Sequence, residues 1–326
     1  MYNSTTEQKI KNIPSIGDMD INRLPQELTR IYAQIVSLKR QITDGTINFQ
    51  ERELVSGLTL LRKLANNLET ILLSNPQHEQ KESIAFVAAT ANSLIYKMGL
   101  ISEKEESLLG INSISSYISS IVLFLIGNSQ ADAAEAAGTI SETKGETLIQ
   151  QRLIASVISL ATGELSKISE SNFNESEISN EEDFELIALN YLWREIGLGI
   201  LYMAKRLIGR SPDEKNLHFD KVIELSVSNT NFFKQRSIFS GPYRLAKLLK
   251  ILEEDIFSRA VINIQPPPNV DKVSWYQFLS KLAKSRPYLW ENHKNALETT
   301  FLHYGVSAVL TLPTGAGKST LSELKI

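Results

Sequence analysis

The residues best suited to chemistry lie in one Gly-rich stretch, residues 312–320 (LPTGAGKST). Glycine has no side chain and reaches backbone conformations closed to other residues. Gly315 and Gly317 therefore allow a row of backbone N–H groups to curve around a phosphate. Lys318 follows directly, where its ammonium group can reach the β- and γ-phosphates of a nucleotide, and the hydroxyl of Ser319 can hold Mg²⁺.

The residues on either side of this stretch position it. The apolar, β-branched run 306–312 predicts a short strand, and the pattern after the glycines predicts a helix from about Lys318. The N-terminus of a helix favours an anion, because its first N–H groups are unpaired and the helix dipole is positive there. Strand, loop and helix in this order predict a phosphate-binding loop.

The strict pattern G-x-x-x-x-G-K-[ST] has Gly where this chain has Leu312. With Leu-Pro-Thr at its start, the stretch resembles motif I of superfamily 2 helicases, the DEAD/DEAH-type family. The resemblance implies ATP and Mg²⁺ as ligands, Lys318 as the catalytic residue and Ser319 as the Mg²⁺ contact. It also implies that the nucleotide is bound by Thr314, Gly315, Ala316, Gly317, Lys318, Ser319 and Thr320.

Residues 286–297 (RPYLWENHKNAL) resemble the segment that precedes motif I in the same family. There an aromatic residue and a Gln precede a short helix and help to recognise adenine. His293 occupies the position expected for the Gln, so the resemblance makes it an adenine contact. The alternative interpretation is a histidine on the surface of a helix.

The resemblance covers only about the last 45 residues. It implies an ATP-hydrolysing helicase or translocase that acts on DNA or RNA. Because the family's acidic motif and arginines come after motif I, we expect the chain to be the N-terminal part of a longer helicase. By itself the chain is expected to hydrolyse ATP negligibly.

Composition bounds the other possibilities. The 326 residues are 42% hydrophobic, enough for a packed core, and none is cysteine, so there is no disulfide framework. With 34 basic and 37 acidic residues, the net charge of −3 gives no global nucleic-acid footprint. The apolar stretch 111–126 is interrupted by serines and predicts a buried helix rather than a membrane span. We expect a cytoplasmic protein that does not contact membranes.

The rest of the chain predicts a mainly α fold: an all-helical N-terminal domain followed by the truncated start of an α/β P-loop (RecA-like) motor domain. The expected division is a flexible arm (1–24), the helical accessory domain (25–264, with an exposed loop at 169–183), a Pro-rich linker (265–271) and the start of the motor (272–326). Apolar spacings of three and four predict helices after Pro25 and at 49–74, 79–100, 105–126, 146–168, 184–207, 219–233 and 243–262, with a loop or weak short helix in 128–145. Short helices at 274–285 and 290–304 follow the prolines.

Three alternatives remain open for the helical part. The cluster of Lys234, Arg236, Arg244, Lys247 and Lys250 with its aromatic neighbours can hold a nucleic-acid strand, or it is the wet side of an amphipathic helix. The small-residue helix 79–100 is a central bundle helix or one that lines a ligand site. The whole of 25–264 can be a regulatory or protein-interaction module without catalytic activity of its own.

A large helical extension ahead of such a motor resembles that of some anti-phage defence helicases, such as the helicase component of Hachiman-type systems. In those systems the helicase works with an effector nuclease. The resemblance therefore implies a protein partner of this kind on the helical domain.

Overall fold

The computed structural model describes residues 24–44, 51–101, 107–139, 145–173, 183–210, 215–228, 236–237, 239–303, 305–307, 309, 311 and 318–325. The predicted arm therefore lies outside the described residues, except for Leu24. That residue begins the first described helix and is buried. Within the described part, no helix is long and apolar enough to cross a bilayer.

The described residues are mainly helical, as the sequence predicted. Of the described helices, ten precede the prolines: α2 (Leu24–Thr43), α3 (Glu51–Ser74), α4 (Lys81–Ile101), α5 (Ser116–Ile126), α6 (Gln130–Ala137), α7 (Leu148–Thr162), α8 (Leu165–Glu170), α9 (Phe184–Leu207), α10 (His218–Leu225) and α11 (Ser240–Ile256).

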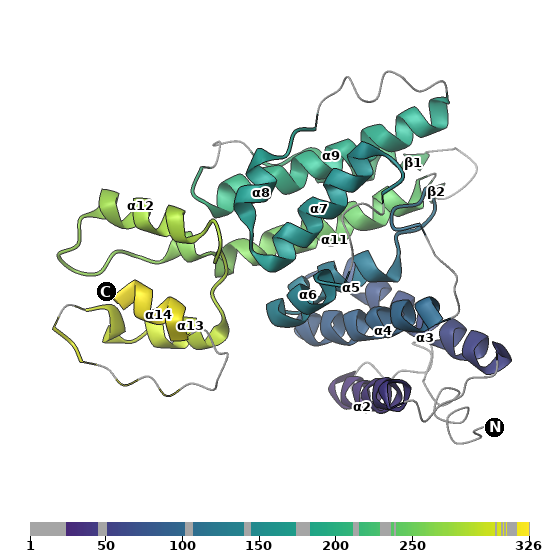
Figure 1. The fold of residues 1–326 in the computed structure, drawn as a ribbon, viewed down its shortest axis with the longest axis horizontal. Coiled ribbons are helices and arrows are strands. Elements are labelled where there is room, and N and C mark those ends of the chain that lie inside the picture. Colours follow the sequence, from purple (N-terminus) through teal and green to yellow (C-terminus); the bar gives the residue numbers. More distant parts are fainter. Residues whose placement is uncertain are drawn as a thin grey trace.

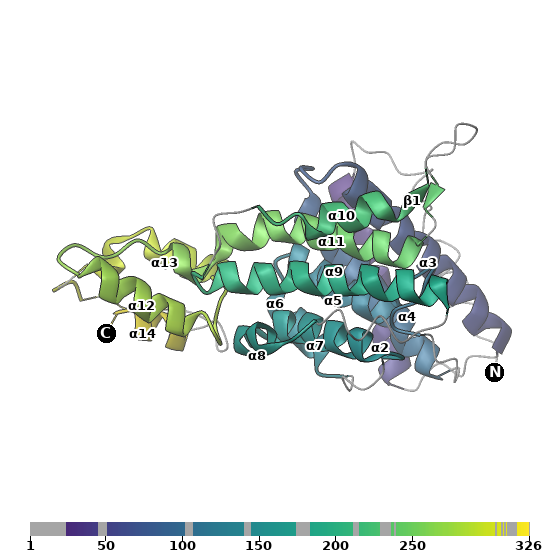
Figure 2. The ribbon, with the colours of Figure 1, turned by 90° about the horizontal axis from the view of Figure 1, so that it is seen from above.

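These helices form a bundle, and the segment after the prolines projects from one end of it (Figures 1 and 2). In Figure 1, α9, α7 and α11 lie above α5 and α6, with α3 and α4 below them and α2 outermost. Most of the buried apolar side chains belong to one continuous cluster that runs through all of these layers.

Helix α5 is the centre of this core. All its residues from Tyr117 to Ile126 are buried, which confirms the prediction of a buried helix here. Each fully buried Leu, Ile, Val or Phe contributes about 1.5–3 kcal/mol relative to an exposed one. The helix is shorter than the predicted 105–126, because the chain before it forms a β-bridge between Leu109 and Ile114. The side chain of Ser115 then caps the new N-terminus by accepting from the Ile118 amide.

The predicted helix 146–168 is interrupted. Gly163 adopts φ = +79°, a left-handed conformation that ends α7 and allows α8 to begin two residues later. Glycine is the residue that adopts this conformation without a steric cost.

The next two predicted helices also have different bounds. The predicted helix 219–233 ends at Leu225, and β1 (Val227–Ser228) follows, paired antiparallel with β2 (Arg236–Ser237). The Ser- and Asn-rich sequence there favours turns over helix. The predicted helix 243–262 begins earlier, as α11, and then tightens into the 3₁₀ turns η5 (Phe257–Arg259) and η6 (Val261–Asn263).

After the prolines come α12 (Lys272–Leu282), α13 (Glu291–Leu297), η7 (Thr300–Leu302) and α14 (Lys318–Lys325). They surround a second, smaller hydrophobic cluster, which includes Trp275, Leu279, Leu289, Phe301 and Leu321 together with Val261 and Ile264 from before the prolines. The residues on both sides of the Pro-rich segment therefore pack together. The Trp275 indole N–H also donates to the Ile264 carbonyl at 2.9 Å.

The strand predicted at 306–312 is not seen at the described positions, 306, 307, 309 and 311, none of which lies in a strand. A parallel strand is stable only beside neighbouring strands. Within the described residues the only sheet is the β1–β2 pair, which lies in the other part of the molecule. The α/β part of the predicted fold is thus not seen, whereas the mainly α part is.

Candidate functional site

The Gly-rich loop itself, residues 312–317, lies outside the described residues, and so do the predicted contacts Thr314, Gly315, Ala316 and Gly317. The helix predicted from about Lys318 does begin at Lys318. Lys318 and Ser319 are exposed in its first turn, whereas Thr320 is buried. The first N–H groups of any helix lack intrahelical partners, so this end of α14 offers donors and a lysine to an anion.

The remainder of α14 is held firmly against the second cluster. Leu321 and Leu324 are buried in it. The guanidinium of Arg286 binds the carboxylate of Glu323 at 2.6 Å, and the ammonium of Lys325 donates to the His303 carbonyl at 2.7 Å. The helix is therefore fixed by its C-terminal half, with its N-terminal end directed to solvent.

His293 lies at the third position of α13 and is buried, with 2% of its surface exposed. The interpretation as a helix-surface histidine is therefore wrong. Its Nδ1 accepts from the Trp290 backbone N–H at 3.3 Å, and the two rings are stacked with centroids 5.5 Å apart. In a neutral ring Nε2 then carries the proton. The role in adenine recognition stays a prediction.

His293 and Lys318 belong to helices that pack on the same hydrophobic cluster. Ala296 and Leu297 of α13 are partly buried against it, as Leu321 and Leu324 of α14 are buried within it. The structure thus brings the two predicted nucleotide-contacting segments into one small module. It describes no group of three or more His, Asp or Glu side chains that could hold a metal ion among these or other described residues.

The basic cluster on α11 is largely committed to contacts within the molecule. Arg244 forms two hydrogen bonds to the buried carboxylate of Glu69, at 2.6 and 2.5 Å. Lys250 is paired with Asp220. Lys247 lies over the ring of Tyr243, 4.8 Å from its centroid. These contacts are those of an amphipathic helix; Lys234 lies outside the described residues, as does the Arg236 side chain.

A buried charged group on α9 was not foreseen from the sequence. Glu195 is 4% exposed at its side chain and contacts Arg194, His218 and Lys221. Burial alone would raise the pKa of Glu195, but the hydrogen bonds and positive charges of His218 and Lys221 outweigh it and lower the pKa. The group ties α9 to α10. Its only sequence signal is a glutamate on the apolar face of a helix.

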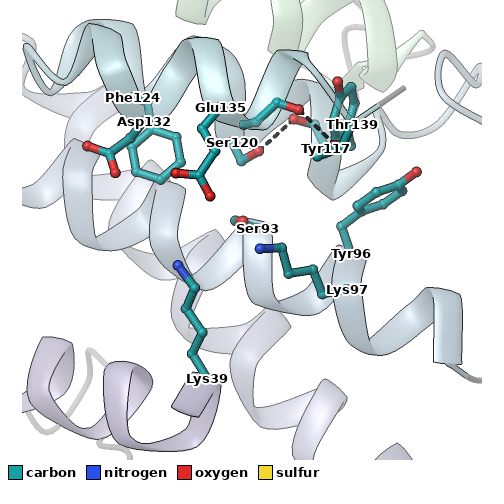
Figure 3. Close-up of a pocket in the computed structure, with 11 residues that line it drawn as sticks. Lys39, Ser93, Tyr96, Lys97, Tyr117, Ser120, Phe124, Asp132, Glu135 and Thr139 are labelled. Atoms are coloured by element: carbon teal, nitrogen blue, oxygen red, sulfur yellow. Dashed lines mark hydrogen bonds between the residues drawn. The ribbon is translucent and has the colours of Figure 1, made fainter. Parts of the chain in front are cut away.

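A pocket opens where α2, α4, α5 and α6 meet (Figure 3). Its lining is mostly polar and charged: Lys39, Ser93, Tyr96, Lys97, Tyr117, Ser120, Phe124, Asp132, Glu135, Ala136 and Thr139. Three of these residues belong to α4, the small-residue helix for which a ligand-lining role was one alternative. The other alternative also holds, because most of α4 is buried in the bundle core.

Comparison of the chain with protein-family models, with curated proteins and with solved structures finds no match in any of the three.

Proposed function

We propose that this chain is the N-terminal part of an ATP-dependent nucleic-acid helicase or translocase, with the phosphates of ATP held at the start of α14. One observation carries the proposal: the sequence Gly-Ala-Gly-Lys-Ser-Thr runs directly into a helix whose first residues, Lys318 and Ser319, are exposed. A Gly-rich loop that opens a helix with Lys and Ser is the arrangement that phosphate binding requires.

The roles of the two residues follow from their chemistry. Lys318 neutralises negative charge on the β- and γ-phosphates as it builds up during phosphoryl transfer. Ser319 supplies one oxygen ligand to Mg²⁺, which keeps several waters and takes further oxygens from the phosphates. An exposed hydroxyl in the first turn suits such an ion, because the coordination shell needs open space.

The helical bundle is proposed to regulate the motor or to bind a protein partner, such as an effector nuclease. Two observations favour this over strand binding by the bundle itself. Arg244 and Lys250 are already paired with carboxylates. The bundle itself exposes the apolar side chains of Leu148 on α7, Phe184 on α9 and Leu225 on α10. The proposal places the protein in the cytoplasm.

The test is ATP hydrolysis by the intact protein with and without single-stranded DNA or RNA. Lys318→Ala should abolish strand-stimulated hydrolysis, since removal of the phosphate-binding charge raises the barrier. Lys281→Ala removes an exposed lysine on α12 and serves as the matched control. Ser319→Ala should raise the Mg²⁺ concentration needed for half-maximal activity. Strand-stimulated hydrolysis retained in Lys318→Ala would refute the motor, leaving the helical interaction module as the function.

A further inference from the structure

The two parts of the chain differ in the sign of their charge. Of the 34 basic and 37 acidic residues, seven basic and four acidic ones follow residue 264, which leaves 27 basic and 33 acidic ones before it. The bundle is therefore acidic, and the segment that contains α12, α13 and α14 is basic. Opposite charges attract, so each part is suited to a partner with the charge of the other.

These two parts meet at one end of α9. The Ser280 hydroxyl of α12 donates to the Ile208 carbonyl, directly after the last residue of α9, at 2.6 Å. With 24 residues, α9 is about 36 Å long, so its first turn lies far from α12. Figures 1 and 2 show α12 at one end of the molecule and the start of α9, near β1, at the other.

Exposed apolar side chains gather around this distant first turn of α9. Phe184 there is 85% exposed, and Leu148 on α7 and Leu225 on α10 are also exposed. The Thr147 hydroxyl donates to the Asn190 side-chain oxygen at 3.1 Å, so the neighbouring Leu148 lies beside the first two turns of α9.

Helix α10 brings its last residue to the same place. It runs antiparallel to α9, because the start of α10 bonds Glu195 and Lys221, about one turn later, lies over the Tyr191 ring. Leu225, a further turn along, therefore reaches the first two turns of α9. The three exposed apolar side chains thus come from three helices that meet at one end of the bundle.

Carboxylates surround these apolar side chains. Each of the three has an exposed acidic residue one or two positions away: Glu146, Asp183, Glu185 and Glu224. None of the four forms an ion pair with another residue that the structure describes. The cation in this region, Lys221, is already paired with Glu195 at 3.4 Å. The four carboxylates and the three apolar side chains form what we call the acidic patch.

Helix α12 has the opposite character on its exposed side. Val273 is 65% exposed, and Tyr276, one turn on, is also exposed. Lys272 is exposed beside them, and Lys284 is partly exposed two turns beyond Tyr276. In the described part of the chain neither ammonium group has a carboxylate partner. Asp271 precedes Lys272, but its carboxylate caps α12 by accepting from a backbone N–H at 2.8 Å. Lys272, Val273, Tyr276 and Lys284 form what we call the basic patch.

We propose that copies of this chain associate head to tail, with the acidic patch of one copy on the basic patch of the next. Each patch has exposed apolar side chains with charges around them, which is the composition of an interface with an apolar centre and a polar rim. The charges select the pairing, because two acidic patches or two basic patches would bring like charges together.

The positions of the two patches determine the kind of assembly. Because they lie at opposite ends of the molecule, a copy that uses one patch still offers the other, so association continues beyond the dimer. A second copy thus becomes the protein partner of the bundle, which rests on the partner-binding role proposed above and is independent of nucleotide binding.

The test is analytical ultracentrifugation of the full 326-residue chain without nucleotide. At low ionic strength the average mass should rise beyond that of a dimer between about 1 and 100 μM, the range of a weak interface. It should fall toward the monomer at about 0.5 M salt, because salt screens the charges. Phe184→Ser should also weaken association, since that side chain is 85% exposed in the single chain and contributes little to its fold.

Two charge-reversed variants test which patches pair. Glu185→Lys with Glu224→Lys reverses the acidic patch, and Lys272→Glu with Lys284→Glu reverses the basic one. Each variant alone should associate at least about tenfold more weakly than the wild type. An equimolar mixture of the two should associate again, because every contact between unlike variants joins opposite charges.

Matched controls make the same changes in net charge at exposed positions outside both patches. They are Glu79→Lys with Glu298→Lys, and Lys63→Glu with Lys205→Glu. Both controls should associate as the wild type does.

Circular dichroism of each variant separates lost association from lost folding. Three results would overturn the head-to-tail assembly: a chain that stays monomeric at all concentrations, a largest species that is a dimer, or folded reversed variants whose mixture fails to associate. Any of these would leave the bundle free to bind a different protein. Loss of ATP hydrolysis in Lys318→Ala bears only on the helicase proposal, so the two can fail separately.

Discussion

Arg244→Met should destabilise the protein strongly, because it leaves a buried carboxylate without its partner. Arg244 of α11 reaches across the bundle to Glu69 of α3 and holds it by two hydrogen bonds. The Glu69 side chain is 3% exposed, whereas that of Arg244 is 24% exposed. Asn92 of α4 donates to the same carboxylate at 3.0 Å, so three helices meet at this one group.

The size of the effect follows from this asymmetry. Removing one partner of a buried ion pair costs about 3–5 kcal/mol. Partial exposure of Arg244 and the remaining hydrogen bond from Asn92 reduce the cost, so we expect a loss of about 2–4 kcal/mol in the free energy of unfolding. Replacing both partners, as in Glu69→Leu with Arg244→Met, should cost less than Arg244→Met alone, because no unpaired charge remains in the core.

The assay is urea denaturation of the wild type, the two single variants and the double variant, which together give a coupling free energy. Lys247→Met is the control on the same helix, and it removes only a contact with the Tyr243 ring, worth about 0.5–1 kcal/mol. If Arg244→Met changed stability by less than the Lys247 control but weakened strand binding, the structural role given to Arg244 would be refuted and the nucleic-acid interpretation of the basic cluster restored.

Three further predictions concern packing, pH and the joint between the two parts of the molecule. Gly241→Ala should destabilise the protein by more than about 2 kcal/mol in urea denaturation, because the new Cβ would lie 2.1 Å from the Gly110 carbonyl oxygen. If the variant were as stable as the wild type, the backbones at Gly241 and Gly110 would not be in such close contact. Burial raises the pKa of Glu253, so the contribution of this carboxyl group to stability is lost as pH rises through that folded pKa. Glu253→Gln should therefore raise the melting temperature at pH 7 but not at acidic pH. A lower melting temperature of the variant at pH 7 would contradict this reasoning. Tyr288→Phe should lower the free energy of unfolding by about 1–3 kcal/mol, because the buried Leu160 carbonyl loses the tyrosine hydroxyl that donates to it at 2.7 Å. An unchanged unfolding midpoint would argue against that hydrogen bond.

The long amphipathic helices could be predicted closely. The helix expected at 184–207 has those bounds, because dense apolar positions are bracketed by a side-chain cap, Asp183, and by Gly209 with φ = +74°. The same logic predicted α3 to within two residues, with Asn-Pro after its end. Where periodicity and end signals agree, local sequence is sufficient.

The errors occurred where local hydrogen bonding competed with helix. Apolar spacing extended the predicted helix back from Ile126 to residue 105, yet Ser115 caps α5 and the bridge between Leu109 and Ile114 shapes the preceding turn. Serine and asparagine can satisfy the backbone in turns as well as in helices. Periodicity counts apolar positions and does not register this competition.

Only part of the candidate site could be predicted, because sequence patterns show local motifs but not which distant residues meet. Lys318 at the start of a helix follows from a local motif, but partners far apart in sequence do not. Glu69 and Arg244 are 175 residues apart, and Lys39 and Asp132 line one pocket from different helices. From the sequence, Arg244 was therefore interpreted as an exposed basic residue. The only sequence feature that indicated the pocket was the set of small residues in α4.

The packing around α14 gives the proposed regulatory role of the bundle a physical route. Leu321 of α14 lies in the same cluster as Val261, whose amide donates to the Pro287 carbonyl at 2.9 Å. Two residues earlier, buried Arg259 approaches the Leu125 carbonyl at the end of α5 and pairs with Glu82 of α4. The three prolines therefore do not act as a flexible linker. The residues on both sides of them pack the segment that contains α12, α13 and α14 against the bundle. Any movement of α14 on nucleotide binding would have to displace these contacts, which run into the centre of the core.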